Sequence, residues 1–151
     1  AMHDITFPPN GQIWIVGDTH GQLEDVLEIT KIVGTPSKNN LILFNGDLVD
    51  RGPMGPEVLL LVYCWKLAWP DYVFINRGNH EFYDLNARYG FEEQFSARYC
   101  PHLYKKALHT FKYLPFAHLI DREVLVIHAG LSDEEDIMLE EIKELPLRQF
   151  P

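Results

Sequence analysis

Short hydrophobic runs alternate with longer amphipathic segments along the first half of the chain. Three of these runs, at residues 13–16, 41–44 and 72–76, are rich in β-branched and aromatic residues and predict strands. Apolar residues recur at helical spacing over 23–33, and a proline opens a second predicted helix over about 56–67. The order strand, helix, strand, helix, strand predicts βαβ units and therefore an α/β fold with a parallel sheet.

The second half of the chain has a different pattern. Helical spacing predicts helices over 91–99 and 103–113, broken near a proline. Two short apolar runs, 116–120 and 124–127, predict a β-hairpin, and a last helix is expected from about 134 to 145. Neither half contains an internal repeat or an interdomain linker, so the pattern indicates one continuous domain.

A polar block that contains glycine directly follows each of the first three predicted strands. These blocks are residues 17–21 (GDTHG), 46–52 (GDLVDRG) and 78–81 (GNHE), and a further polar segment, 128–130 (HAG), follows the hairpin. Ligands bind at the carboxyl ends of parallel strands, so the blocks are expected to meet at one edge of the sheet. Their glycines allow tight turns and a close approach of the backbone to an ion or a phosphate.

The side chains in these blocks form the ligand set of a two-metal centre. Carboxylate and amide oxygens combined with imidazole nitrogens suit divalent ions that act in hydrolysis. Asp18 and His20 can point at one cation, and Asp47 can bridge two cations with its two oxygens. Asn79 offers a carbonyl oxygen and His128 a nitrogen to the second ion. The sequence alone leaves the metal open, because Mn, Fe and Zn all suit these ligands.

Three further residues in the same blocks are candidates for catalysis. His80 follows the candidate ligand Asn79 and is placed to protonate a leaving alkoxide as a general acid. Asp50 is the expected partner that orients His80. Arg51 carries a planar guanidinium that suits phosphate oxygens. Any one of these blocks alone could be an ordinary turn, whereas three of them at three strand ends favour a metal site.

Composition and charge narrow the class of protein. The chain has 151 residues, of which 46% are hydrophobic and 23% charged, as is typical of a globular domain. Its formal net charge of -9 argues against nucleic-acid binding, which needs a basic surface. The longest apolar run, 58–65, is too short to cross a membrane. Two cysteines provide no disulfide framework, which suits a reducing compartment.

The three blocks also resemble those of the phosphoprotein phosphatases, the metal-dependent serine/threonine phosphatases. The family pattern is Gly-Asp-x-His-Gly, Gly-Asp-x-Val-Asp-Arg-Gly and Gly-Asn-His-Glu, and this sequence matches all three at similar spacing. One departure is His128-Ala129-Gly130, where the family has His-Gly-Gly. The resemblance implies the metallophosphoesterase (calcineurin-like) fold, with a parallel or mixed sheet, flanking helices and only part of the fold present.

The resemblance further implies an activity and a set of roles. It implies hydrolysis of phosphoserine and phosphothreonine by in-line attack of a hydroxide held by two divalent ions, Mn, Fe or Zn. It assigns Asp18, His20 and Asp47 to one metal and Asp47, Asn79 and His128 to the other. The expected partners are a phosphoprotein substrate and regulatory subunits or domains, with no nucleic acid and no membrane. The expected location is the cytoplasm or the nucleus.

In the same resemblance, Arg51 binds phosphate and His80 forms the acid pair with Asp50. Family catalytic domains run well beyond 151 residues, and their remaining part supplies a further histidine and a second arginine. We therefore expect residues 11–151 to be the N-terminal portion of a catalytic domain, with an incomplete second metal site and little or no activity. Residues 1–10 are expected to be an N-terminal extension, because an alanine precedes Met2. The surface left by the absent portion is expected to favour self-association.

Two other functions remain open from the sequence. Related metallophosphoesterases share these blocks, so a hydrolase of dinucleoside polyphosphates or other small phosphoesters is an alternative. A protein of another class, an inactive phosphate-binding or scaffold module, is the second alternative, because half of the phosphate clamp is absent.

Overall fold

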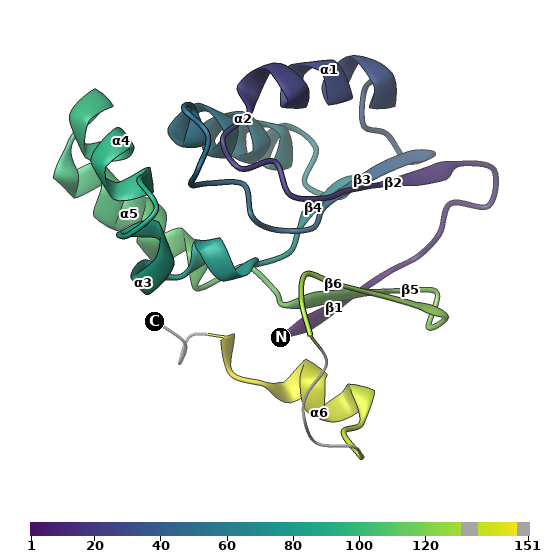
Figure 1. Cartoon of the computed structure of the whole chain (residues 1–151). Coiled ribbons are helices and arrows are strands. Elements are labelled where there is room, and N and C mark those ends of the chain that lie inside the picture. The colour runs from purple at the N-terminus through teal and green to yellow at the C-terminus, as the bar shows by residue number, and fades with distance from the viewer. Residues whose placement is uncertain (131–135, 148–151) are drawn as a thin grey trace.

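Two three-stranded sheets form the centre of the protein (Figure 1). The computed structural model describes residues 1–130 and 136–147. The first sheet has the order β2-β3-β4 and is wholly parallel, with β2 at Gln12–Val16, β3 at Asn40–Phe44 and β4 at Val73–Ile75. Its three strands all end on the same side, because a helix between successive strands returns the chain to the edge at which each strand begins.

The second sheet is mixed. Its order is β1-β5-β6, and it is formed by β1 (Met2–Ile5), β5 (Ala117–Ile120) and β6 (Val124–Ile127). Strand β1 runs parallel to β5, whereas β5 and β6 form an antiparallel hairpin. The two sheets lie face to face, so β6 brings its carboxyl end toward the loops of the first sheet.

Helices cover the outer faces of both sheets (Figure 1). Helices α1 (Leu23–Val33) and α2 (Gly55–Ala68) lie on the first sheet, and the short α6 (Leu139–Glu144) lies outside the second. Beyond the ends of the first sheet's strands come η1 (Asn79–Glu81), α3 (Tyr83–Asn86), α4 (Phe91–Arg98) and α5 (Pro101–Phe111).

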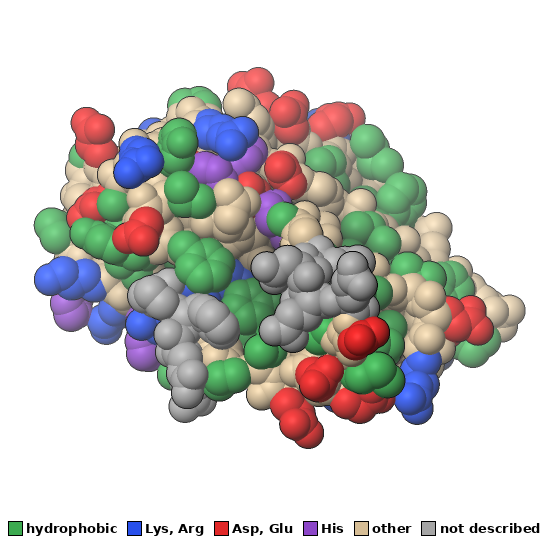
Figure 2. Space-filling view, turned by 60° about the horizontal axis from the view of Figure 1, so that its bottom comes forward, with side chains coloured by type: hydrophobic (Ala, Val, Ile, Leu, Met, Phe, Trp, Pro, Cys, Tyr) green, Lys and Arg blue, Asp and Glu red, His purple; other side chains and the backbone are tan. Residues whose placement is uncertain are grey.

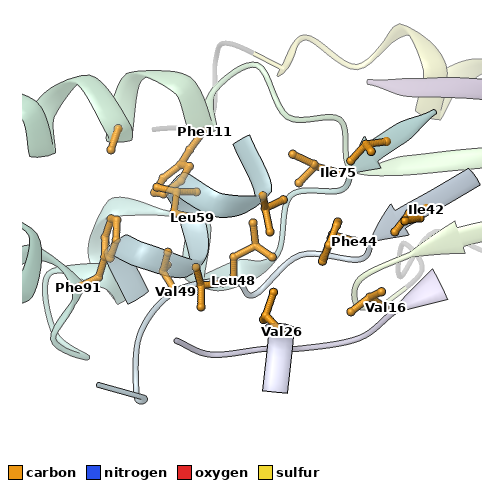
Figure 3. Packing of buried hydrophobic residues seen from close by; sticks show 14 of the residues in the cluster. Val16, Val26, Ile42, Phe44, Leu48, Val49, Leu59, Ile75, Phe91 and Phe111 are labelled. Atoms are coloured by element: carbon orange, nitrogen blue, oxygen red, sulfur yellow. The ribbon is translucent and has the colours of Figure 1, made fainter. Parts of the chain in front are cut away.

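The hydrophobic core has two main parts, and β3 contributes to both. Ile42 and Phe44 point into the larger cluster under the helices, shown in Figure 3. Leu41 and Leu43 point the other way, into the cluster between the two sheets. Successive side chains of a strand alternate between its faces, so a central strand covered on both faces is apolar throughout.

The predicted strands and helices are confirmed with shifts of a few residues at their ends, and so is the α/β architecture with parallel and mixed sheets and flanking helices. Besides the short elements η1 and α3, which were not predicted, three features differ. Two sheets are present rather than a single parallel one, and β1 lies inside the predicted N-terminal extension, where no strand was expected. The last helix begins at Leu139, and its predicted start at 134–135 falls outside the described residues.

No helix in the described parts of the chain combines the length and the apolar character that crossing a membrane requires.

Candidate metal centre

Four side chains of the candidate site stand on left-handed backbone. The φ angles are 39° at His20, 51° at Asp47, 68° at Asp50 and 64° at Arg51. Such angles are rare outside glycine, and each strained residue costs about 1–3 kcal/mol. Outside the site, positive φ at non-glycine residues occurs in the described chain at Asp121 and Arg122, in the turn between β5 and β6. Strained residues often cluster at functional sites, where a particular side chain is needed. The second block, with three of the four, is the most distorted.

The glycines of the second and third blocks allow two loops to touch backbone to backbone. A Cβ atom on Gly78 would lie 2.2 Å from Asp47 Oδ1 and 2.4 Å from Asp47 N, and one on Gly46 would lie 2.4 Å from Gly78 N. By contrast, a Cβ atom on Gly17 would meet nothing within 4 Å. The close approach at Gly46 and Gly78 brings the ligands of both loops to one point.

His20 presents an imidazole nitrogen that has no hydrogen-bond partner. Its Nδ1 lies 2.9 Å from the carbonyl oxygen of Val49, so Nδ1 carries the hydrogen and Nε2 the lone pair. Nε2 is buried and, among the described residues, unpaired, although it lies 3.4 Å from Asp47 Oδ2 and 3.8 Å from Asp18 Oδ2. The lone pair of Nε2 therefore faces two carboxylates, and a cation bound between them would balance their negative charge.

His128 reaches the same place from the second sheet. Its Nδ1 lies 2.6 Å from the carbonyl oxygen of Asn45, and its Nε2 lies 3.3 Å from Asp47 Oδ2 and 3.0 Å from Asn79 Oδ1. The hydrogen bond with Asp47 raises the pKa of His128 to about 9, and the charge of Asp18 adds to this effect. The surroundings of His128 therefore favour a positive charge at this point.

Asp47 lies at the centre of the cluster. Burial pushes its pKa upward, but the hydrogen bonds from His128 and from the His80 backbone outweigh burial, so its pKa lies below the ordinary value. Asp47 Oδ1 accepts the backbone N–H of His80 at 2.9 Å, whereas Oδ2 faces both His20 and His128. One oxygen of Asp47 for each cation is the prediction from the sequence, whereas in the structure Oδ2 alone faces both imidazoles.

The candidate ligands form two groups that share Asp47. Ligand atoms of Asp18, Asp47 and His128 lie within 4.8 Å of one another, as do those of His20, Asp47 and His80. Asp18 Oδ2 also lies 3.8 Å from His20 Nε2, so the predicted sharing of one metal by Asp18, His20 and Asp47 stays a prediction. Both ring nitrogens of His80 have other partners, which leaves His20 as the available imidazole of its group.

His80, Asp50 and Arg51 form a chain of contacts beside these ligands. His80 Nδ1 donates to Asp50 Oδ2 at 2.7 Å, and Asp50 Oδ1 accepts the backbone N–H of Phe91 at 2.9 Å. His80 Nε2 lies 3.3 Å from Arg51 Nη2 and accepts, because a guanidinium only donates. Burial raises the pKa of Asp50, although His80 opposes the rise. The structure thus brings the three candidate catalytic residues together.

Glu81, quoted in the third block but given no role from the sequence, ties two loops together. Its carboxylate accepts the backbone N–H groups of Asp47 and Gly78, both at 2.8 Å, and that of Leu48 at 2.9 Å. Burial, together with the charge of Asp47, raises the pKa of Glu81 to about 7. The sequence signal that could have revealed this role is an acidic residue three positions after Gly78, in a glycine-containing block that follows a predicted strand.

The metal centre adjoins the surface, where the side chain of Asp18 is 56% exposed. In Figure 2 histidine side chains lie together among acidic and basic ones on one face of the protein. A cavity of about 570 Å³ adjoins Asn79 and His128, with walls that include Phe82 and Phe116. The site is therefore open to a ligand from solution.

The donor set and the unpaired nitrogen fit divalent cations, and comparison with known proteins points the same way. Residues 11–151 match the family model described as calcineurin-like phosphoesterase. The chain belongs to the calcineurin-like phosphoesterase family. The members of this family that it resembles in sequence are named as serine/threonine phosphatases, which confirms the resemblance seen in the three blocks.

Two curated relatives illustrate the likeness. Serine/threonine-protein phosphatase T of Schizosaccharomyces pombe is 43% identical over 145 residues, which are 96% of this chain and 31% of the relative. Serine/threonine-protein phosphatase 5 of Homo sapiens is 38% identical over 151 residues, which are 100% of this chain and 30% of the relative. The chain thus spans about a third of the length of these relatives.

Solved structures show the same fold. A protein serine/threonine phosphatase from Saccharomyces cerevisiae superposes with a TM-score of 0.96 at 38% identity, over 99% of this chain and 48% of that one. A putative diadenosine tetraphosphatase superposes with a TM-score of 0.62 at 23% identity, over 91% of this chain and 58% of that one. The second likeness is one of fold alone.

Proposed function

We propose that this chain is the metal-binding portion of a serine/threonine protein phosphatase that hydrolyses phosphoserine and phosphothreonine in proteins. The observation that carries the proposal is the convergence of His20 Nε2 and His128 Nε2 on one oxygen of Asp47, at 3.4 Å and 3.3 Å. The names of the relatives at 38–43% identity support the choice of substrate class.

Two divalent cations fit this arrangement. Asp18, His20 and Asp47 would hold one, and Asp47, Asn79 and His128 the other, with Mn, Fe and Zn all suited to these donors. When bound, such ions lower the pKa of a bound water and neutralise charge on a phosphoryl group. We propose that the second site is the weaker one in this chain, because Asn79 brings a neutral oxygen and His128 must first lose a proton.

The remaining residues bind phosphate and handle a proton. The side chain of Arg51 is exposed and offers its guanidinium to phosphate oxygens. When Arg51 turns to the phosphate, Nε2 of His80 loses its present partner and can hold the proton that a leaving alkoxide takes up. Asp50 fixes the ring by accepting the hydrogen on Nδ1, as the 2.7 Å separation requires.

Phosphoproteins are the proposed substrates, and regulatory subunits or further domains are the proposed partners. We place the protein in the cytoplasm or the nucleus, a location that suits its two free cysteines, Cys64 and Cys100. The net charge of -9 supports the proposal that the protein binds divalent cations and not nucleic acid.

Turnover in the presence of Mn²⁺ tests the proposal. We expect slow release of phosphate from a phosphoserine peptide and slow hydrolysis of p-nitrophenyl phosphate, both abolished in Asp47→Asn, which removes the shared charge. Diadenosine tetraphosphate serves as the competing substrate. Preferential cleavage of the dinucleotide would overturn the substrate class, and the absence of both turnover and Mn²⁺ binding would favour a scaffold module.

A further inference from the structure

The metal centre depends on two sheets keeping their relative position, because His128 alone comes from the second sheet. Asn45, at the end of β3 in the first sheet, holds His128 in two ways. Its carbonyl oxygen accepts the Nδ1 hydrogen of His128 at 2.6 Å, and its side-chain Nδ2 donates to the carbonyl oxygen of Ile127 at 3.0 Å. Asn45 therefore fixes both the ring of the candidate ligand and the peptide that precedes it.

Asn45 is in turn held by Asn76, which lies at the end of β4. Asn76 Nδ2 donates to Asn45 Oδ1 at 2.7 Å and to the carbonyl oxygen of Val126 at 3.1 Å. Both amide hydrogens of Asn76 are thereby used, and its side chain is fully shielded from solvent. The side chain of Asn76 is thus hydrogen-bonded both to the loop after β3 in the first sheet and to strand β6 in the second sheet.

The amide oxygen of Asn76 is satisfied from the second sheet. His118, on β5, has Nδ1 at 2.7 Å from Asn76 Oδ1 and is 1% exposed. Since Asn76 Oδ1 can only accept, Nδ1 of His118 carries the hydrogen. Burial lowers the pKa of His118 to about 4, so the ring is neutral near pH 7 and suits this role. The chain of hydrogen bonds from His118 to His128 is complete.

A buried polar chain in this place needs an explanation beyond stability. Its surroundings include the apolar cluster of Ile5, Leu43 and Ile120 between the sheets. Apolar side chains at positions 76 and 118 would suit that cluster, but they would take the present donor away from Asn45 Oδ1 and from the carbonyl oxygen of Val126. A satisfied polar network, by contrast, accepts only one relative position of its members and so defines the geometry of what it joins.

We propose that Asn76 and His118 are positioning residues that act through Asn45 to hold His128 at the metal centre. The proposal deepens the proposed function and rests on it in one respect, that His128 is a metal ligand. Residues that orient a metal-bound histidine affect metal affinity by about tenfold to hundredfold when they are replaced.

Four variants of the full 151-residue chain test it. Asn76→Leu and His118→Leu break the chain, whereas His118→Asn keeps a donor, because the amide nitrogen of asparagine can occupy the place of Nδ1. Ile120→Val is the matched control, since it loosens the same apolar cluster on the same strand without touching the network. The readouts are the Mn²⁺ dissociation constant by isothermal titration and the ¹⁵N NMR signal of His128 Nδ1–H in metal-free protein.

We expect the two leucine variants to weaken Mn²⁺ binding by about tenfold to hundredfold and to broaden or shift the His128 Nδ1–H signal. His118→Asn and Ile120→Val should leave both readouts close to those of the unsubstituted chain. Unchanged affinity and an unchanged His128 signal in a folded leucine variant would overturn the proposal. If Asn76→Leu does not fold, the result for His118→Leu decides the proposal. An unsubstituted chain that binds no Mn²⁺ contradicts the proposed function instead, and the NMR signal then decides the positioning role alone.

Discussion

His80 Nδ1 and Asp50 Oδ2 lie 2.7 Å apart in a pair that is 1% and 0% exposed. A hydrogen bond between an imidazole and a carboxylate that are both shielded from water fixes the orientation of the ring. The pair lies beside Arg51 and the ligand cluster, so the orientation of His80 Nε2 toward Arg51 depends on Asp50.

The first prediction concerns Asp50→Asn. Removal of the carboxylate charge should slow hydrolysis of a phosphoserine peptide by about tenfold to hundredfold, within the range that general acid catalysis contributes. Hydrolysis of p-nitrophenyl phosphate should fall much less, because nitrophenolate leaves without being protonated. Steady-state rates with Mn²⁺ on both substrates check this, with the exposed Asp25→Asn as the control. Equal losses on the two substrates would contradict the role of the pair.

A second prediction contrasts two glycines of the polar blocks. Gly78→Ala places a Cβ atom 2.2 Å from Asp47 Oδ1, so it should weaken Mn²⁺ binding severely and destabilise the fold by about 1–3 kcal/mol. Gly17→Ala meets nothing within 4 Å and should change neither property. Isothermal titration and urea denaturation measure the two effects. Normal metal binding by Gly78→Ala would mean that the loops need not approach so closely.

A third prediction links metal binding to pH. His128, with a pKa of about 9, must lose its proton before Nε2 can bind a metal. Binding at pH 7 should therefore release about one proton, and the affinity of that site should rise about tenfold per pH unit up to pH 9. Titration calorimetry in two buffers of different ionisation enthalpy gives the number of protons. Binding with no proton release would show that the metal does not use His128.

The fourth prediction concerns folding stability and His118. Burial, together with the charges of His3 and Lys66, lowers its pKa from 6.5 to about 4 in the folded state. The unfolded state therefore binds more protons between these two pH values, so stability is present above pH 6.5 and is lost as the pH falls toward 4. His118→Asn should flatten this loss by on the order of 1–3 kcal/mol. Urea denaturation from pH 7 to pH 4 measures it, and parallel curves for the two proteins would contradict the assignment.

The fifth prediction is self-association, which the sequence suggested and which stays a prediction. Strands β2 and β6 stand at the edges of the sheets formed by the described residues, and Ile15 and Val124 on them are each 51% exposed. Unpaired edges with apolar side chains favour pairing with another chain. Sedimentation velocity over a range of concentrations should show self-association that the double variant Ile15→Lys, Val124→Lys reduces. A monomer at all concentrations would count against it.

Local pattern was sufficient for most elements of the fold. Strands β2 and β3 and helix α1 have a strong period of their own and were predicted nearly to the residue. Strand β1 was missed because it is short, lacks a clear alternation and exists through pairing with β5, more than a hundred residues away. The arrangement in two sheets likewise depends on contacts between distant segments, which a local pattern does not contain.

In the candidate site, too, some residues could be predicted from local sequence and others could not. The sequence identified the side chains that converge, because glycine-flanked blocks at strand ends are a local signal. It did not reveal how they are supported, since Glu81 and Asn76 act on residues 30 or more positions away. His118 falls within the run 116–120 that predicts a strand, and only the fold shows that its ring faces Asn76.

The left-handed backbone at His20, Asp47, Asp50 and Arg51 has a consequence for engineering. Glycine adopts those angles freely, so replacing any of the four with glycine would relieve strain while deleting a ligand or a catalytic group. Selection for thermal stability alone would therefore favour loss of these ligands and catalytic groups. A screen for more stable variants would have to select for metal binding at every round.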